Sequence, residues 1–330
     1  MTPIDHIPRV KLTSLPTPIE PLSNLSRHLG GPKILVKRDD LTTLGMGGNK
    51  TRKLEFLVAD ALEQGADTLI TTGGVQSNHC RLTAAAATRH GLHCELILGA
   101  DSVPQGVSSG NLMLDQILGA RLHFVPLAQR NQKMEEVAAE LRKTGRTPYI
   151  VPLGGSNGLG AIGYANAMVE LKGQLCHMDW LVDHIIFPTS SGGTQAGMQL
   201  GAHISGFQGH LTGISIDQTL DNGFPESLAS IANDAAGILG LEWVATPGQF
   251  ALNADYLGGG YGVMGDLERE AIVLAARTEG LFVDPVYSAR ALGGMIHMID
   301  QGTLPAGETI LFWHTGGTPA LFAYADALDA

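Results

Sequence analysis

A lysine in a glycine-rich run near the N-terminus is the strongest candidate for a reactive group. The run reads Gly47-Gly48-Asn49-Lys50-Thr51-Arg52-Lys53, and residues 51–62 after it carry apolar side chains at helical spacing. The glycines let the backbone approach a ligand closely. The helix dipole and partial burial of Lys50 both favour its neutral amine, the form that attacks a carbonyl. A solvated lysine beside a glycine turn would show the same run.

A second polar run lies between an expected strand at 68–72 and an alanine-rich helix at 81–90. It reads Gln76-Ser77-Asn78-His79. Free backbone amides at the start of a helix favour carboxylates, so this turn is a candidate substrate site. Ser77 can donate or relay a proton, and the amide of Asn78 can reach a ring substituent. The alternative is that Ser77 or Asn78 only caps the helix.

A third run, Ser190-Ser191-Gly192-Gly193-Thr194, follows an expected strand at 184–187. Small and hydroxylated residues between a strand and a helix can hold a phosphate. The run lacks the lysine of a Walker loop, and it is not a GxGxxG dinucleotide motif. It therefore predicts a site for a single phosphate ester, unless it is a plain glycine turn.

Two candidates lie near the C-terminus, in the run Asp284-Pro285-Val286-Tyr287-Ser288. Tyr287 is a candidate acid or base, and Ser288 a candidate partner for a ring nitrogen; a core tyrosine and a turn serine are the alternatives. We also expect the polar stretch 154–164 to face the ligand between domains, and we assign no role to the glycine loop 258–262. A nucleophilic amine, a single-phosphate site and ring-contacting groups are together what a Schiff base to pyridoxal phosphate requires.

Short apolar runs alternate with helical patterns along the 330 residues. The length suggests about two domains. The alternation predicts an α/β protein with two parallel-sheet domains and helices on both faces. The expected strands are residues 33–37, 68–72, 94–98, 121–125, 149–151, 184–187, 211–216 and 309–313, with helices that include 81–90, 111–118 and 134–143.

The net charge of −11 and the absence of a long basic run argue against nucleic-acid binding. No apolar stretch is long enough to span a bilayer, so we expect no membrane partner. The three cysteines form no CxxC pattern, which predicts neither a disulfide nor a metal site. We expect a cytoplasmic protein.

With these motifs in place, the sequence resembles the D-cysteine desulfhydrase and 1-aminocyclopropane-1-carboxylate deaminase family. These are fold-type II pyridoxal phosphate enzymes related to the tryptophan synthase β subunit. The resemblance covers nearly the whole chain. It rests on seven motifs: Pro16-Thr17-Pro18-Ile19-Glu20, Lys37-Arg38-Asp39-Asp40, Gly47-Gly48-Asn49-Lys50, Gln76-Ser77-Asn78-His79, Gly154-Gly155-Ser156-Asn157, Asp284-Pro285-Val286-Tyr287 and His314-Thr315-Gly316-Gly317.

The resemblance implies pyridoxal 5'-phosphate as cofactor and a role for each matched residue. Lys50 would form the Schiff base, and Tyr287 would lie near the substrate. The substrate carboxylate and cofactor ring would be faced by Ser77 and Asn78, with Gln76 and His79 nearby. The phosphate would be held by Ser191, Gly192, Gly193 and Thr194. The implied architecture is a large cofactor domain of residues 1–53 and 165–330, a small inserted domain of residues 54–164, and a homodimer.

Two residues differ from the ring-opening deaminases of this family. Ser288 stands where those enzymes carry glutamate, and Thr315 stands where they tend to have leucine. A serine beside the pyridine nitrogen implies a weaker electron sink, which suits elimination of a good leaving group. The remaining motifs are most similar to the branch that releases sulfite from L-cysteate, a small anionic amino acid.

Three other readings stay open at this point. The same chemistry on D-cysteine would release sulfide. A non-catalytic protein that senses an amino acid or the cofactor is a second alternative, which the joint presence of Lys50, Ser77 and Tyr287 argues against. A nicotinamide dehydrogenase is disfavoured by the missing GxGxxG.

Overall fold

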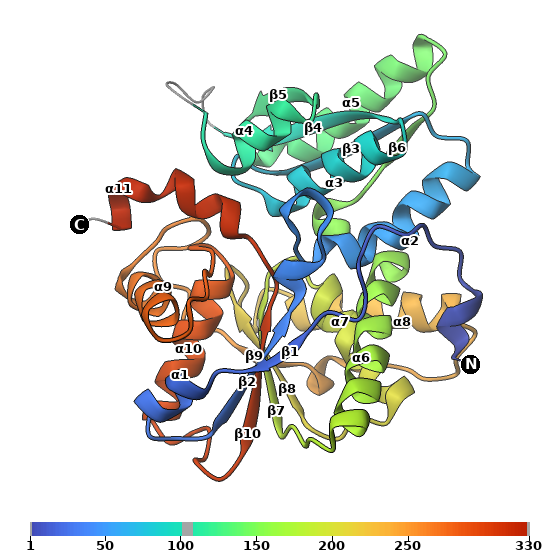
Figure 1. Cartoon of the computed structure of the whole chain (residues 1–330). Coiled ribbons are helices and arrows are strands. Elements are labelled where there is room, and N and C mark those ends of the chain that lie inside the picture. The colour runs from blue at the N-terminus through green and yellow to red at the C-terminus, as the bar shows by residue number, and fades with distance from the viewer. Residues whose placement is uncertain (1, 101–107, 329–330) are drawn as a thin grey trace.

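The computed structural model describes residues 2–100 and 108–328. They form two β-sheets, each of which is covered by its own helices (Figure 1). The larger sheet has six strands, in the order β1 (Ile19–Pro21), β2 (Lys33–Arg38), β10 (Thr309–His314), β7 (His184–Thr189), β8 (His210–Ser215) and β9 (Ala251–Asn253). All neighbours in it are parallel except β1, which runs antiparallel to β2 at the edge.

The smaller sheet has four parallel strands and lies above the larger one in Figure 1. Their order is β5 (Arg121–Val125), β4 (His93–Gly99), β3 (Thr68–Gly74) and β6 (Pro148–Ile150). The chain enters this domain through helix α2 (Lys50–Glu63) and leaves it through α6 (Gly158–Met178). The two predicted domain boundaries therefore fall inside helices.

Alternating side chains divide the core of the larger sheet into two layers. Ile34 and Val36 of β2 pack with α1 (Ser23–His28), α9 (Asp266–Glu279) and α10 (Ser288–Asp300). Leu35, between them, packs on the opposite face with α6 and α7 (Gly193–Ser205), as the two-residue period of a strand requires. Helix α8 (Phe224–Ile238) packs outside α6 and α7, and the short α11 (Ala325–Leu328) ends the described chain.

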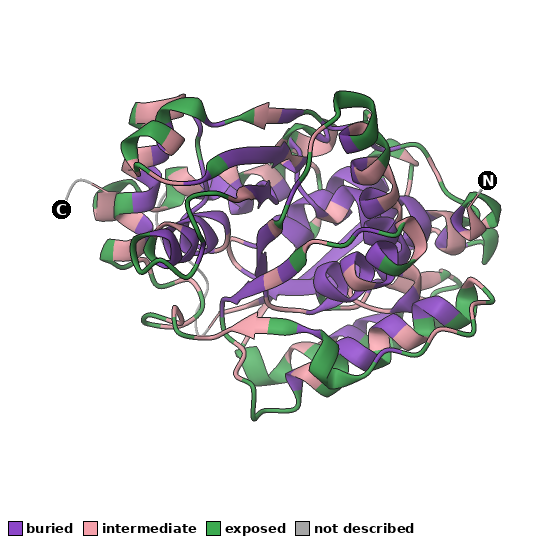
Figure 2. Cartoon of the chain, turned by 90° about the horizontal axis from the view of Figure 1, so that it is seen from below, coloured by how far each residue is buried: buried purple, intermediate pink, exposed green. Residues whose placement is uncertain are grey.

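The smaller sheet is covered in the same way. Leu69 and Leu96 pack with α2, α3 (Asn78–Arg89) and α4 (Gly110–Ile117), whereas Ile70 and Ile97 pack with α5 (Arg130–Lys143) on the other face. Figure 2 shows the buried residues concentrated on the strands and on the inner faces of the helices. The prediction of parallel α/β sheets with helices on both faces is confirmed.

All eight predicted strands are present, each with ends within two residues of the expected ones. The short strands β1 and β9 were missed, because three residues carry too little alternation to stand out. No helix in the described part of the chain combines the length and the apolar character needed to cross a bilayer.

A buried charge network fixes the first turn of α2. The Asp39 carboxylate accepts hydrogen bonds from Arg52 Nη2 at 2.8 Å and from Arg52 Nε at 2.9 Å. It also accepts from Tyr164 Oη at 2.6 Å and Trp313 Nε1 at 2.8 Å. Glu170 accepts from the same guanidinium. The positive charge of Arg52 and these hydrogen bonds outweigh burial and lower the pKa of Asp39 to about 2.

Replacing Asp39 by Asn keeps the shape of the side chain and removes its charge from this network. We expect the apparent free energy of unfolding in urea to fall by about 3–5 kcal/mol, because Arg52 loses a buried partner. The neighbouring Asp40→Asn is the matched control. Asp40 pairs with Arg38 near the surface, so its loss should cost about 1 kcal/mol or less. Equal losses in the two variants would contradict a special role for the buried pair.

Candidate active site

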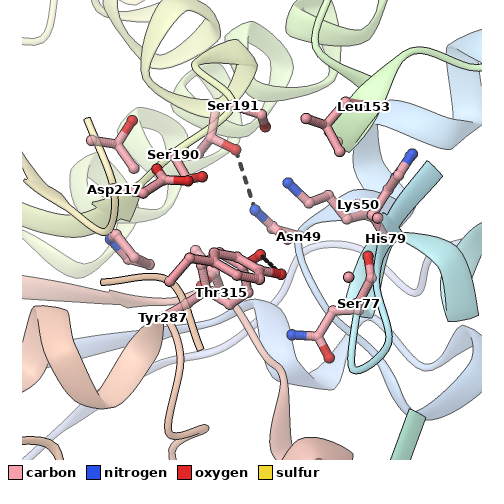
Figure 3. Close-up of a pocket in the computed structure, with 18 of the residues that line it drawn as sticks. Asn49, Lys50, Ser77, His79, Leu153, Ser190, Ser191, Asp217, Tyr287 and Thr315 are labelled. Atoms are coloured by element: carbon pink, nitrogen blue, oxygen red, sulfur yellow. Dashed lines mark hydrogen bonds between the residues drawn. The ribbon is translucent and has the colours of Figure 1, made fainter. Parts of the chain in front are cut away.

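A cavity of about 250 Å³ lies where the carboxyl ends of strands from both sheets meet (Figure 3). Ligands bind at this edge in open α/β sheets. Nine of the residues predicted from the sequence line it: Lys50, Ser77, Asn78, His79, Ser191, Gly192, Thr194, Tyr287 and Thr315. The structure therefore gathers segments that are up to 265 residues apart in sequence, the separation of Lys50 and Thr315.

Lys50 is the first residue of α2, as the glycine run predicts, and its amine points into the cavity (Figure 3). The loop before it is held in place, since Asn49 N donates to Thr315 O at 2.9 Å and Arg81 Nη2 donates to Gly47 O at 3.0 Å. Burial lowers the pKa of Lys50 to about 8. A sizeable fraction of this amine is therefore neutral and nucleophilic near neutral pH.

Glycine is required directly across from this amine. Gly154 has a φ of +67°, and a Cβ at this position would lie 3.3 Å from Lys50 Nζ and 2.2 Å from Ser191 Oγ. A side chain there would fill the space in front of the amine. The predicted polar stretch 154–164 thus reaches the cavity at its first residue, and the rest of it starts α6.

The predicted phosphate site lies at the N-terminus of α7. Ser191 and Thr194 line the cavity, and Gly192 has a φ of +86° that favours glycine. Thr194 Oγ1 accepts from Asn49 Nδ2 at 3.2 Å. Gly193 lies just outside the lining, where its amide donates to Ser156 Oγ at 3.1 Å.

A second lysine, which the sequence motifs did not indicate, lies directly behind this wall and outside the lining. Lys53 Nζ is buried one helical turn after Lys50 and donates to Gly154 O at 3.1 Å and Ser156 Oγ at 3.2 Å. A Cβ on Gly193 would lie 3.0 Å from it. Burial, and then the charge of Lys50, lower its pKa well below the usual range. No carboxylate of the described chain lies within 4 Å of this amine.

The polar groups of this wall fit a phosphate ester. Lys53 is a buried amine without a counter-ion, and an anion beside it would restore its charge. Thr189 Oγ1 is buried at the end of β7, lines the cavity and has no hydrogen-bond partner in the described chain. The Gly193 amide is taken up by Ser156 Oγ, so Lys53, Thr189 and the remaining amides at the start of α7 are the donors that this wall offers to an anion. The spacing of Lys53, three residues after Lys50 on one helix, was the available sequence signal.

The start of α3 forms the opposite wall, and only part of its predicted run faces the cavity. Ser77 caps the helix, since its Oγ accepts from Cys80 N at 3.2 Å, and its hydroxyl also lines the cavity. Asn78 lines the cavity while its Oδ1 accepts from Asn111 Nδ2 at 2.9 Å. The structure does not bring Gln76 into the lining, because its amide bonds Ser109 O and Asn111 N instead.

His79 lines the cavity as a neutral imidazole. Thr71 Oγ1 donates its hydrogen to Val151 O at 2.8 Å, so His79 Nε2, at 2.8 Å from the same oxygen, must be the donor. Its Nδ1 is left as a buried acceptor without a partner in the described chain. Burial and the nearby lysines lower its pKa well below 6.5.

Tyr287 is paired with a tyrosine from the glycine loop that had no assigned role. Tyr287 Oη donates to Tyr261 Oη at 2.9 Å, and the rings meet edge to face. Burial raises the pKa of Tyr287, and it raises that of Tyr261 to about 12. Both phenols are therefore protonated at neutral pH, which suits a proton donor better than a base. The single aromatic residue among the glycines was the signal for Tyr261.

Ser288 is buried below the cavity and does not line it. Its Oγ donates to Asp284 Oδ1 at 2.6 Å and accepts from Asp284 N at 2.8 Å. These contacts fix the start of α10 directly after Tyr287. A role for Ser288 as partner of a ring nitrogen stays a prediction.

Two charged residues that sequence reasoning missed also line the cavity. Arg130 begins α5 in the small domain, and Asp217 follows β8 in the large domain, beside Ser190 (Figure 3). Their neighbours in sequence form no motif, so only the fold reveals that both reach the cavity.

Comparisons with known proteins identify the family of this chain. The family model described as "Pyridoxal-phosphate dependent enzyme" matches residues 10–316. A D-cysteine desulfhydrase of Klebsiella pneumoniae (strain 342) is 40% identical over 328 residues, which are 97% of each chain. The crystal structure of a homologue of ACC deaminase superposes with a TM-score of 0.88 and 36% identity, covering 99% of this chain and 97% of the other.

A more distant structure shares the fold. O-ureido-L-serine synthase superposes with a TM-score of 0.65 at 16% identity, covering 98% of this chain and 93% of the other.

The lowered pKa of Lys50 predicts how the cofactor-free protein reacts with pyridoxal phosphate. A pKa of about 8 leaves about 10% of the amine neutral at pH 7, against about 0.03% at the ordinary pKa. We expect the rate at which the visible absorbance of the bound cofactor appears to rise with pH, with a midpoint near 8. Lys50→Ala should give none of this absorbance. A midpoint near 10.5 would contradict the assignment.

The position of Lys53 predicts that its loss weakens the binding of pyridoxal phosphate more than the binding of pyridoxal, which lacks the phosphate. In Lys53→Met we expect the dissociation constant for pyridoxal phosphate to rise about 10–100-fold, because a charged hydrogen bond to phosphate is lost. Binding of pyridoxal should change far less. Lys143→Met, at the exposed end of α5, is the control. Equal weakening for both aldehydes would show that Lys53 serves only the fold.

Proposed function

This chain belongs to the pyridoxal-phosphate dependent enzyme family, and we propose that it eliminates sulfite from L-cysteate. At the coarser level it is a pyridoxal phosphate-dependent carbon–sulfur lyase of the D-cysteine desulfhydrase and ACC deaminase type. The observation that carries the elimination chemistry is the Lys50 amine, with its lowered pKa, facing one cavity with a proposed phosphate site and two phenols. The choice of L-cysteate rests on the resemblance of the sequence motifs.

Each wall of the cavity has a part in binding. Lys53, Thr194 and the first amides of α7 would hold the cofactor phosphate, and Lys50 would bind its aldehyde. Ser77 and the first amides of α3 would hold the substrate carboxylate, since these N–H groups have no helical acceptor. When bound, the cofactor supplies an electron sink for the charge that develops at the substrate Cα.

Proton transfer is assigned to groups whose pKa values suit it. Lys50 Nζ in its neutral form would accept the proton from the substrate Cα. Tyr287 Oη stays protonated and can donate on the side of Tyr261. The bond between Cβ and sulfur breaks with its electron pair leaving on sulfite. With one water, L-cysteate gives pyruvate, hydrogen sulfite and ammonium, so atoms and charge balance.

The 40% identical relative supports a second candidate, elimination of sulfide from D-cysteine. The two candidates share the lysine, the phosphate site and the tyrosine pair. They differ in the charge of the group on Cβ and in the hand of Cα. Product analysis therefore separates them better than any feature common to both.

The purified holoenzyme should be incubated with L-cysteate, D-cysteate, L-cysteine and D-cysteine, with pyruvate, sulfite and sulfide measured. We expect equal amounts of pyruvate and sulfite from L-cysteate, with a kcat/KM at least about tenfold above that for D-cysteine, a preference of about 1.4 kcal/mol. Lys50→Ala should abolish both the absorbance of the bound cofactor and turnover.

The other outcomes have definite meanings. Sulfide from D-cysteine as the main product would replace the proposal by the second candidate. A protein that is yellow yet inert toward all four amino acids would be a binding protein.

A further inference from the structure

Arg130 is held at the cavity by its own surroundings. It follows the 3-10 helix η4 (Leu127–Gln129), and its Nε donates to Leu127 O at 3.0 Å. Its methylene stem packs over the end of β4, where a Cβ on Gly99 would lie 2.9 Å from Arg130 Cδ. Packing of the stem leaves the two terminal nitrogens of the guanidinium for another partner.

No protein anion takes up this charge in the described chain. Arg130 forms no ion pair with a carboxylate there, and the only hydrogen bond that its side chain donates is the one to Leu127 O. The other cation that lines the cavity, Lys50, is committed to the cofactor aldehyde. Arg130 is thus the one lining cation of the described residues that remains for a substrate group.

The charges on the two walls favour the Arg130 side for an anion. Asp217 is exposed where it follows β8; burial is the largest cause that raises the pKa of Tyr261 and Tyr287, and the charge of Asp217 is the smallest. A second anion there would be repelled. The charge of Arg130 lowers the pKa of the Cys80 thiol slightly, whereas burial raises it. Cys80 lies in the first turn of α3, next to Ser77, so the positive field reaches the expected carboxylate site.

We propose that the Arg130 guanidinium binds the sulfonate of the substrate and so selects amino acids with an anionic group on Cβ. The inference rests on the proposed function and names the sulfonate-binding group that the sequence motifs lack. A guanidinium presents two parallel N–H donors to two oxygens of such a group. A neutral substituent on Cβ, such as a thiol or a chlorine, cannot form a comparable charge pair with the guanidinium.

The test compares L-cysteate with β-chloroalanine, whose leaving group starts neutral. For each holoenzyme, pyruvate release gives kcat/KM for both compounds, and L-cysteate is also titrated as an inhibitor of β-chloroalanine elimination. In Arg130→Gln we expect the KM or inhibition constant of L-cysteate to rise about 10–100-fold, and the L-cysteate to β-chloroalanine ratio of kcat/KM to fall at least about tenfold. Arg130→Lys should recover part of the loss.

Arg142→Gln is the matched control, because it removes the same charge from an exposed position about 18 Å further along α5. In this control the KM and the inhibition constant of L-cysteate should change less than about twofold. The inference would be overturned if Arg130→Gln lowered kcat/KM for both substrates by the same factor, or if it changed neither value.

The inhibition constant keeps the two proposals separate. If the wild type releases no sulfite, the proposed function fails, while weaker inhibition by L-cysteate in Arg130→Gln still supports an anion site at this residue. If L-cysteate neither reacts with nor inhibits the wild type, both proposals are overturned.

Discussion

The buried ion pair between Arg52 and Asp39 holds the reactive lysine in place. Lys50 stands two residues before Arg52, at the start of the same helix, so the pair sets the position of the helical turn that carries the amine. A buried pair repays its desolvation only when its hydrogen bonds are well satisfied. Here Tyr164, Trp313 and Glu170 satisfy them, and they come from α6 and β10. The scaffold of the large domain thereby fixes a group at its border with the small one.

Four cations near the cavity differ in function because they differ in burial and in partners. Arg52 is buried and paired, so it is structural. Lys50 is desolvated without a partner, which lowers its pKa into the range of a nucleophile. Lys53 is buried without a carboxylate partner and donates to Gly154 O and Ser156 Oγ, beside the N-terminus of α7. Arg130 lines the cavity, and its guanidinium has no carboxylate partner in the described chain. Side chains of the same charge are thus assigned to the fold and, in our proposals, to the chemistry, the cofactor and the substrate.

The cavity depends on both domains at once. The large domain supplies the α7 N-terminus and the tyrosine pair, and the small domain supplies the start of α3 and Arg130. The connections between them are α2 and α6, and Lys50 lies at the first residue of α2. The lysine is therefore placed where both domains contribute to its surroundings, and water is displaced from its amine by groups from each.

The sequence by itself determined what depends on neighbouring residues. Strand alternation gave eight strands and the fold class, and a glycine run at the start of a helix indicated Lys50. Only the tertiary structure decided that Lys53 faces Gly154, a hundred residues further on, and that Tyr261 pairs with Tyr287. It also turned Gln76 away from the cavity. The physical reason is that periodicity and turn chemistry act over a few residues, whereas desolvation, charge pairing and cavity lining arise between segments that only the packed chain brings together.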